Sequence, residues 1–236
     1  MKTFFAALTA VALSASASAA VVTQWNFNGP SSGSPYLTPS TGAGSVVSVG
    51  GVTFADGSGS SNGGSSDPLG SNANNRGLQT TGYSAQGSNS GGSGVQFNVS
   101  TAGYDSIVIN WDQRHSNTSS RWVQFQYSLD GVNFTAAGLS GDGLFQGTSG
   151  DTWFNNRTVD LSGIAGVANN ANFAFRIVAV FAPNTTAYAA STSTATYAGT
   201  GTWRFDMVTL NGNVVPAPGA LALLAAGGLV MGRRRR

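Results

Sequence analysis

The 236-residue sequence contains no cysteine, no glutamate and a single histidine. Without cysteine, the chain has no disulfide framework, no thiolate metal site and no cysteine nucleophile. His115 alone cannot build a usual zinc site, so no zinc is predicted. His115 lies three residues after Asp112 and next to Arg114. We interpret it as a strand-end or loop residue that makes ordinary hydrogen bonds, and we predict no catalytic residue.

Charge is also scarce, because only 8% of the residues are charged. Lys2 and the four arginines at 233–236 belong to the ends of the chain. Without them, six arginines remain against nine aspartates. The body therefore carries a net charge of −3 and has no basic stripe, which excludes a nucleic-acid partner.

The end of the chain is an apolar run closed by positive charge. Fourteen mostly small apolar residues, 219–232, are preceded by Val215, Pro216, Ala217 and Pro218 and followed by Arg233, Arg234, Arg235 and Arg236. As a helix, fourteen residues span about 21 Å, which is shorter than a hydrocarbon core of about 30 Å. The segment is therefore suited to transient membrane association, with the arginines kept at the cytoplasmic face. A permanent tail anchor is the alternative, and the short length disfavours it.

The order of these three parts resembles the PEP-CTERM sorting signal of Gram-negative bacteria. The resemblance covers Val215 to Arg236 and rests on Val-Pro-x-Pro, the following Gly-Ala-Leu-Ala-Leu-Leu and the terminal arginines. The family pattern has Glu between the two prolines, where this sequence has Ala217. The resemblance implies an exosortase-type membrane protease as partner, processing near Pro216 to Pro218, and delivery to the cell surface or extracellular matrix.

The beginning of the chain has the pattern of a secretory signal peptide. Lys2 is followed by an apolar stretch from Phe4 to Leu13, and Ala19 and Ala20 offer small-residue cleavage sites. The sequence therefore predicts a signal peptide (1–20), an exported body (21–213) and a sorting segment (214–236) that forms a hydrophobic helix.

Several segments of the body alternate between apolar and polar residues, as half-buried strands do. Segment 106–114 places Ile107, Ile109 and Trp111 on one face. Three further segments are read as strands: 122–129, with Val123, Phe125, Tyr127 and Leu129 inward; 202–210, with Trp203, Phe205 and Met207 inward; and 173–181, a central strand that is apolar on nearly both faces.

Shorter strands are expected at 21–27, 46–54, 95–99, 132–135 and 154–161, the second with a bulge at its glycine pair. About nine strands and no convincing amphipathic helix predict an all-β fold, an antiparallel β-sandwich of the jelly-roll type. The stretch from about Ile107 to Gly131 also resembles the jelly-roll bodies that accompany this sorting signal. We expect one short helical turn at 162–167, capped by Ser162. Segment 56–94 is rich in Gly, Ser and Asn, so we expect a long surface loop whose main ordered part is 76–81.

Polar residues on the predicted strands are the candidate ligand-binding set. They are expected to converge on one sheet face, where amides and charges bind sugars: Asn110, Asp112, Arg114, Gln124, Gln126, Arg176, Arg204 and Asp206. Trp122 and Trp153 are candidate stacking platforms. The alternative is that ion pairs, Arg176 with Asp206 or Arg204 with Asp112, only satisfy buried charge.

No cofactor is predicted, although Asp130, Asp142 and Asp151 are weak calcium candidates because carboxylates are hard oxygen ligands. Asp-Gly turns explain the same residues. The sequence thus favours a non-enzymatic, exported surface or matrix protein that is structural or associates with extracellular polysaccharide. The alternative is a secreted hydrolase that uses Asp residues.

Overall fold

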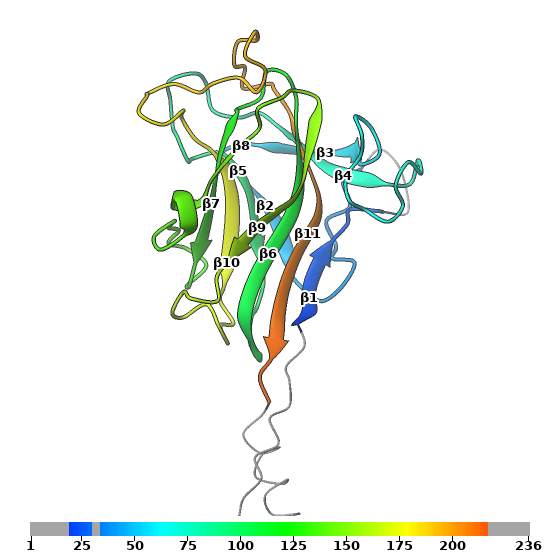
Figure 1. Cartoon of the computed structure of the whole chain (residues 1–236), viewed down its shortest axis with the longest axis vertical. Coiled ribbons are helices and arrows are strands. Elements are labelled where there is room, and N and C mark those ends of the chain that lie inside the picture. The colour runs from blue at the N-terminus through cyan, green and yellow to red at the C-terminus, as the bar shows by residue number, and fades with distance from the viewer. Residues whose placement is uncertain (1–18, 30–33, 217–236) are drawn as a thin grey trace, which may run out of the picture.

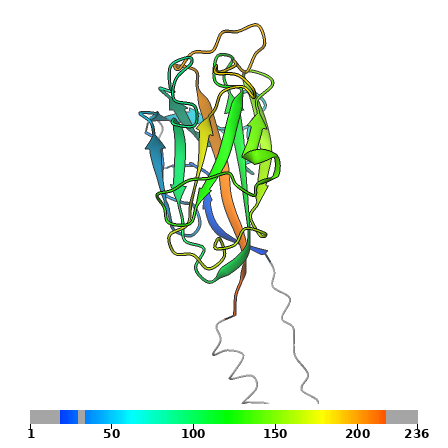
Figure 2. The same cartoon turned by 90° about the vertical axis from the view of Figure 1, so that its left-hand side faces the viewer.

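A computed structural model describes residues 19–29 and 34–216 and shows two antiparallel β-sheets packed face to face (Figures 1 and 2). The described chain contains no α-helix and a single 3-10 turn, Ser140–Gly143. The strands are β1 Ala19–Trp25, β2 Ser45–Val49, β3 Thr53–Ser58, β4 Arg76–Thr81, β5 Gly94–Asn98, β6 Tyr104–His115, β7 Trp122–Ser128, β8 Leu144–Gln146, β9 Thr152–Asp160, β10 Ala174–Ala179 and β11 Trp203–Val214. The prediction of an all-β sandwich is confirmed.

The chain crosses repeatedly between the two sheets, and of the described strands only β3 and β4, and β7 and β8, are consecutive strands of the same sheet. One sheet has six strands in the order β3-β4-β11-β6-β9, with β1 also paired to β11, and the other has five in the order β2-β5-β10-β7-β8. Within the eight strands β4 to β11, β4 lies beside β11, β5 beside β10, β6 beside β9 and β7 beside β8. Two interleaved Greek keys give this order.

The core between the sheets consists of the inward residues of the alternating strands. Ile107, Ile109 and Trp111 of β6 are buried, as are Val123 and Phe125 of β7. Ring stacking joins the two layers where Trp111 of β6 lies over Phe125 of β7 at 5.7 Å, and it continues within the five-stranded sheet, where Phe125 lies over Phe175 of β10 at 5.5 Å. The alternation therefore predicted the buried face of these strands correctly.

Two predicted inward residues lie elsewhere. Leu129 is 40% exposed because β7 ends at Ser128. Met207 is half-buried because the register between β11 and β6 shifts there, and the shift turns Val208 and Leu210 into the core. A bulge inserts one residue into one strand and so reverses the alternation after it.

Segment 46–54 is not one bulged strand. Val46 and Val49 belong to β2 in the five-stranded sheet, whereas β3 begins at Thr53 in the six-stranded sheet. Gly50 and Gly51 both have positive φ, at 66° and 83°. The glycine pair is therefore a turn that carries the chain from one sheet to the other, because glycine adopts this conformation without steric cost.

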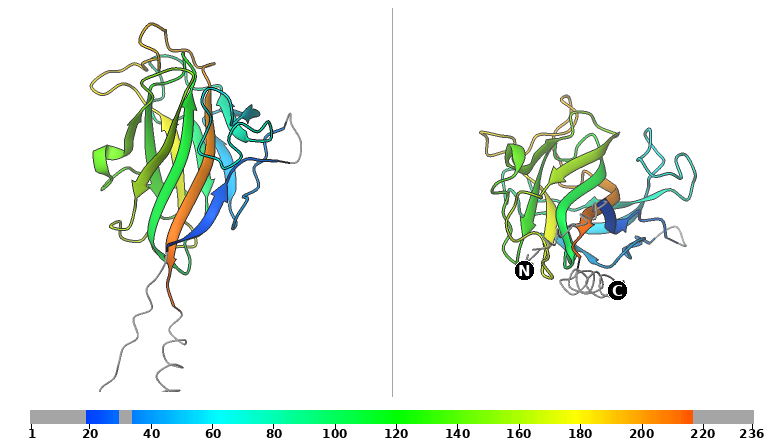
Figure 3. Two further views of the ribbon diagram at one scale, coloured as in Figure 1. Left: turned by 45° about the vertical axis from the view of Figure 1, so that its right-hand side comes forward. Right: turned by 60° about the horizontal axis from the view of Figure 1, so that its bottom comes forward.

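Other local predictions also need correction. Within segment 56–94, the expected ordered part 76–81 forms β4, but β3 extends into the predicted loop as far as Ser58. Residues 59–75 fold against the six-stranded sheet and make many hydrogen bonds (Figure 3, cyan, beside β11 in orange). Segment 132–135 is not a strand, since only Thr135 bridges to Tyr127. Residues 162–167 form successive turns rather than a helix, and Asp160 accepts the Ser162 amide.

The two ends of the described chain lie together at one end of the sandwich (Figures 1 and 2). Ala19 pairs with Asn213 because β1 runs antiparallel to β11. We call this end of the sandwich the terminal pole, and the end that holds the connection between β10 and β11 the distal pole. The signal peptide to residue 18 and the sorting residues Ala217, Pro218 and Arg233 to Arg236 lie outside the described residues. No helix in the described ranges is long and apolar enough to span a membrane.

Candidate functional site

The eight polar residues predicted to converge lie on two opposite outer faces. Asn110, Asp112, Arg114, Arg204 and Asp206 belong to β6 and β11 of the six-stranded sheet, whereas Gln124, Gln126 and Arg176 belong to β7 and β10 of the five-stranded sheet. The prediction of a single face is therefore wrong, because alternation shows which residues face outward but not which sheet a strand joins. Because Arg176 and Asp206 lie on opposite outer faces, they do not form an ion pair.

The carboxylates of the six-stranded sheet are covered by the 59–75 segment. Asp112 accepts hydrogen bonds from the backbone amides of Ser66 at 2.5 Å and Asn156 at 2.7 Å. Asp206 lies opposite Asp112 in the strand register and accepts from the Ser65 hydroxyl at 2.5 Å. Both side chains are buried. These carboxylates hold the segment in place and are closed to a ligand.

Burial without a counter-ion changes the protonation of Asp206. The pKa of Asp206 is raised to about 8, chiefly by desolvation and to a smaller extent by the nearby charges of Asp67 and Asp112, against the hydrogen bonds from Ser65 and Met207. A carboxyl group that is removed from water and placed beside like charges favours its neutral form. Asp206 is therefore a protonated acid at neutral pH.

The arginines of this face are also engaged. Arg204 donates to Gln79 Oε1 at 2.9 Å and to Ser61 Oγ at 2.7 Å, so it does not pair with Asp112. Arg114 forms an ion pair with Asp151. Asn110 bonds to Thr158 and Asn211, and Trp153 is buried with its indole donating to the Ser61 carbonyl. Trp153 is thus not a stacking platform.

His115 lies between the sheets at the end of β6 and is fully buried. Its Nδ1 lies 2.9 Å from the Ser120 carbonyl oxygen and its Nε2 lies 3.3 Å from Arg157 Nη2. Desolvation and the Arg157 charge lower the His115 pKa well below its usual value, and desolvation lowers the pKa of Arg157 to about 9. This geometry makes His115 a neutral structural residue, and Ser191 Oγ at 3.3 Å is the side-chain hydroxyl beside it.

The calcium candidates do not form a site together. Asp130 binds its own turn through the amides of Val132 and Asn133, which hold its pKa well below the usual value. Asp151 pairs with Arg114, and Asp142 lies in the 3-10 turn. Within residues 19–29 and 34–216, no group of three or more His or Asp side chains is placed to hold a metal ion.

The outer face of the five-stranded sheet carries a connected row of half-buried polar side chains. Arg176 Nε donates to Gln126 Oε1 at 2.6 Å, Gln126 Nε2 donates to Gln124 Oε1 at 2.7 Å, and Gln124 Nε2 donates to the Asp142 carbonyl at 3.0 Å. Gln96 lies opposite Arg176 in the strand register and donates to Asn98 Oδ1 at 2.7 Å. We call Gln96, Asn98, Gln124, Gln126 and Arg176 the polar track.

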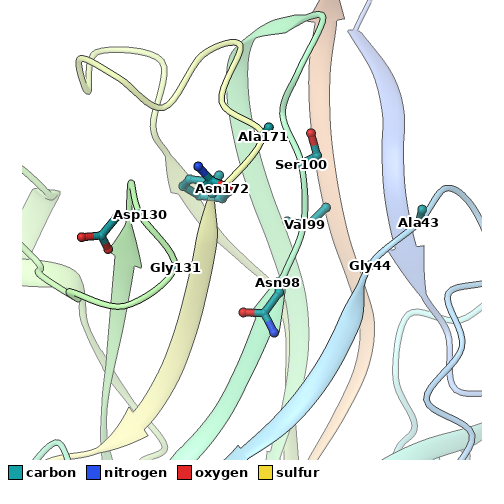
Figure 4. A pocket seen from close by; sticks show the side chains of 10 residues that line it. Ala43, Gly44, Asn98, Val99, Ser100, Asp130, Gly131, Ala171 and Asn172 are labelled. Carbon is teal, nitrogen blue, oxygen red and sulfur yellow. The ribbon is translucent and has the colours of Figure 1, made fainter.

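The polar track has an aromatic wall and an open end. The Arg176 guanidinium lies 4.4 Å from the centre of the Phe134 ring. At one end of the track, Asn98 lines an open depression of about 440 Å³ together with Gly44, Asn172 and Phe173 (Figure 4). Figure 4 shows the Asp130 carboxylate at the rim, turned away from Asn98. The track therefore offers amide groups, one cation and an exposed hollow on the same face.

Three residues of this surface were not among the sequence candidates. Gln96 and Asn98 flank the buried Phe97 in β5, so the alternation at 95–99 placed them on the outer face and could have identified them. Phe134 lies in a loop after β7, and no pattern in the sequence indicates that it reaches Arg176.

Comparison with known proteins finds no match by sequence and distant similarity by structure. No protein-family model and no curated protein sequence matches it. The N-terminal CBM22-1-CBM22-2 tandem domain of Xyn10C from Paenibacillus barcinonensis is 13% identical, with a TM-score of 0.44 over 87% of this chain and 49% of that one. This chain spans about half the length of that structure. A cleaved adhesin domain of Lys-gingipain from Porphyromonas gingivalis is 11% identical, with a TM-score of 0.40 over 83% of this chain and 99% of that one. At this similarity neither assigns a ligand or an activity.

Proposed function

We propose that this chain is an exported, non-enzymatic protein of the cell surface or extracellular matrix that associates with polysaccharide through its polar track. The observation that carries the proposal is the track itself: five neighbouring, half-buried amide and guanidinium side chains on three paired strands, ending in an open depression. Amides held in place by each other recognise hydroxyl groups with little loss of side-chain freedom.

The rest of the proposal comes from the ends of the sequence. The PEP-CTERM resemblance supports sorting by an exosortase-type protease in a Gram-negative bacterium, and the strand order of β4 to β11 supports a jelly-roll body. Both ends of the body lie at the terminal pole, so a chain held by its C-terminal segment would project the distal pole outward.

The alternative of an Asp-dependent hydrolase has weaker support. Glycoside cleavage requires two carboxyl groups that reach the substrate. Asp112 and Asp206 are the closest such pair in the strand register, yet both are buried under the 59–75 segment with backbone or hydroxyl donors on their oxygens. The open face carries amides instead of carboxylates.

A glycan array of the purified protein tests the proposal. We expect binding without turnover, and we expect the paired change Gln124→Ala with Gln126→Ala to weaken it about tenfold, since each lost hydrogen bond is worth about 1 kcal/mol. Asn110→Ala on the opposite face is the control and should leave binding unchanged. Product formation that disappears in Asp112→Asn would instead support the hydrolase.

A further inference from the structure

Arg176 differs from every other arginine of the body in how its guanidinium is used. Arg76 and Arg114 form ion pairs with Asp56 and Asp151. Arg121, Arg157 and Arg204 each donate from at least one Nη atom to a protein oxygen. Arg176 donates only from Nε, so within the described part of the chain its two Nη atoms make no hydrogen bond to the protein.

Among residues 19–29 and 34–216, no carboxylate forms an ion pair with this cation. Burial alone lowers the pKa of Arg176, and no neighbouring acid raises it again. The outer face of β5, β10 and β7 carries no acidic residue. Of the acids at its margins, Asp130 is held by its own turn. A half-buried cation without a counter-ion attracts an anionic group from outside.

The guanidinium is also oriented before any ligand arrives. Gln126 accepts from Nε at 2.6 Å, and the Phe134 ring covers the guanidinium at 4.4 Å. These contacts fix the plane of the guanidinium and leave the Nη edge available. Two parallel N–H groups on this edge match the two oxygens of a carboxylate.

We propose that Arg176 binds the carboxylate of an acidic sugar, so the polysaccharide that the polar track recognises contains uronic acid residues. This inference rests on the proposed function. The neighbouring amides of Gln96, Asn98 and Gln124 would bind the hydroxyl groups of the same or adjacent sugars. A carboxylate suits a site with one cation better than a phosphate dianion does, because a single guanidinium neutralises one charge.

The test compares two polymers that differ only in the charged group. Binding of purified protein to alginate, a polymer of uronic acids, and to carboxyl-reduced alginate is measured by isothermal titration calorimetry. We expect alginate to bind at least about tenfold more tightly, as one charge-assisted bidentate pair allows. We also expect the preference to weaken as salt rises, because the pair is only half-buried.

Two variants of Arg176 test whether this residue causes the preference for alginate. Arg176→Gln should remove the preference for alginate over the reduced polymer, whereas Arg176→Lys should retain only part of this preference because lysine lacks the planar fork. Arg121→Gln removes the same charge next to the distal end of β7 and should not change the binding of either polymer. Thermal melts of each variant establish that it is folded.

The outcomes separate the two proposals. Equal binding of both polymers overturns the role of Arg176 while the polysaccharide-binding function stands. Binding of dextran sulfate that matches alginate and also depends on Arg176 overturns the uronic acid assignment. No binding to any polymer of the array or to either alginate overturns both proposals.

Discussion

Asp206 is the residue whose protonation depends most directly on the fold. Its folded pKa of about 8 lies above the ordinary aspartate value of 3.8, so the unfolded chain releases this proton at lower pH than the folded protein does. The stability that protonated Asp206 contributes is therefore complete below about pH 4 and is lost as the pH rises toward 8. Asp206→Asn cannot titrate and keeps the shape of the neutral acid. We expect the difference in unfolding free energy between pH 5 and pH 8 to shrink by on the order of 2 kcal/mol in this variant.

Urea denaturation at pH 5 and pH 8 measures this difference. Asp142→Asn is the control, because Asp142 is exposed and lies in the 3-10 turn beside the other sheet. The same pH dependence in Asp206→Asn and in the unmodified protein would show that Asp206 does not titrate as its burial requires.

Gly147 lies directly against the side chain of His115, which is distant in sequence. A Cβ atom at Gly147 would lie 2.4 Å from Cγ of the buried His115 ring, whereas a Cβ at Gly163 would meet no atom within 4 Å. Because His115 is held by Ser120 and Arg157, its ring cannot move aside freely. We expect Gly147→Ala to destabilise the protein by about 1–3 kcal/mol and Gly163→Ala to be neutral or slightly stabilising. Thermal melts of the two variants give the comparison, and equal melting temperatures would contradict it.

At the scale of elements, the 59–75 segment is the part of the chain whose order depends on a few polar contacts. Ser65 Oγ donates to Asp206 and accepts from Asn75 Nδ2 at 3.4 Å, so it links the segment to β11. Ser65→Ala removes this link and leaves the neutral acid of Asp206 without its hydroxyl partner. We expect amide hydrogen exchange across 59–75 to quicken at least about fivefold, the effect of roughly 1 kcal/mol of lost local stability. Ser48→Ala, an exposed change in β2, should leave exchange there unchanged.

The same segment shows why the sequence predicted some elements and missed others. Strands β6, β7 and β10 were predictable because their apolar residues alternate or run together, and burial enforces that pattern. The 59–75 segment has almost no apolar residue, and its order comes from hydrogen bonds to Asp112, Asp206 and Arg204, which are distant in sequence. Composition reports the apolar surface available for burial but not polar contacts that form only in the folded chain.

The candidate site was half predictable for a related reason. Gln124 and Gln126 were identified because they alternate with buried neighbours, and Arg176 because it is the one charged residue in an otherwise apolar strand. The sequence did not show that these residues lie on the opposite sheet from Asp112 and Asp206. The assignment of a strand to a sheet depends on long-range pairing, such as β11 with β6 and β10 with β7. Alternation has a period of two in either sheet and contains no information on that choice.

At the scale of the whole molecule, both ends of the described chain lie at the terminal pole. The sorting hypothesis therefore predicts how the protein is oriented relative to the membrane. Only four residues, 215–218, separate Val214, the end of β11, from Gly219, the start of the apolar run. The five residue steps from Val214 to Gly219 span at most about 18 Å when fully extended, so a chain held by that run keeps its terminal pole near the membrane and its distal pole away from it.

Because the chain has no cysteine, single cysteines can report this orientation. Val132→Cys lies in the turn after β7 at the terminal pole, where Val132 is 77% exposed. Thr194→Cys is exposed in the connection between β10 and β11 at the distal pole. In purified protein a bulky, membrane-impermeant maleimide should label both at similar rates. In cells whose protease is absent, so that the chain stays held, we expect labelling at Val132→Cys to slow severalfold relative to Thr194→Cys. Equal rates in held and released protein would show that the terminal pole does not face the membrane, and a mature mass that still includes Arg233 to Arg236 would contradict the sorting hypothesis directly.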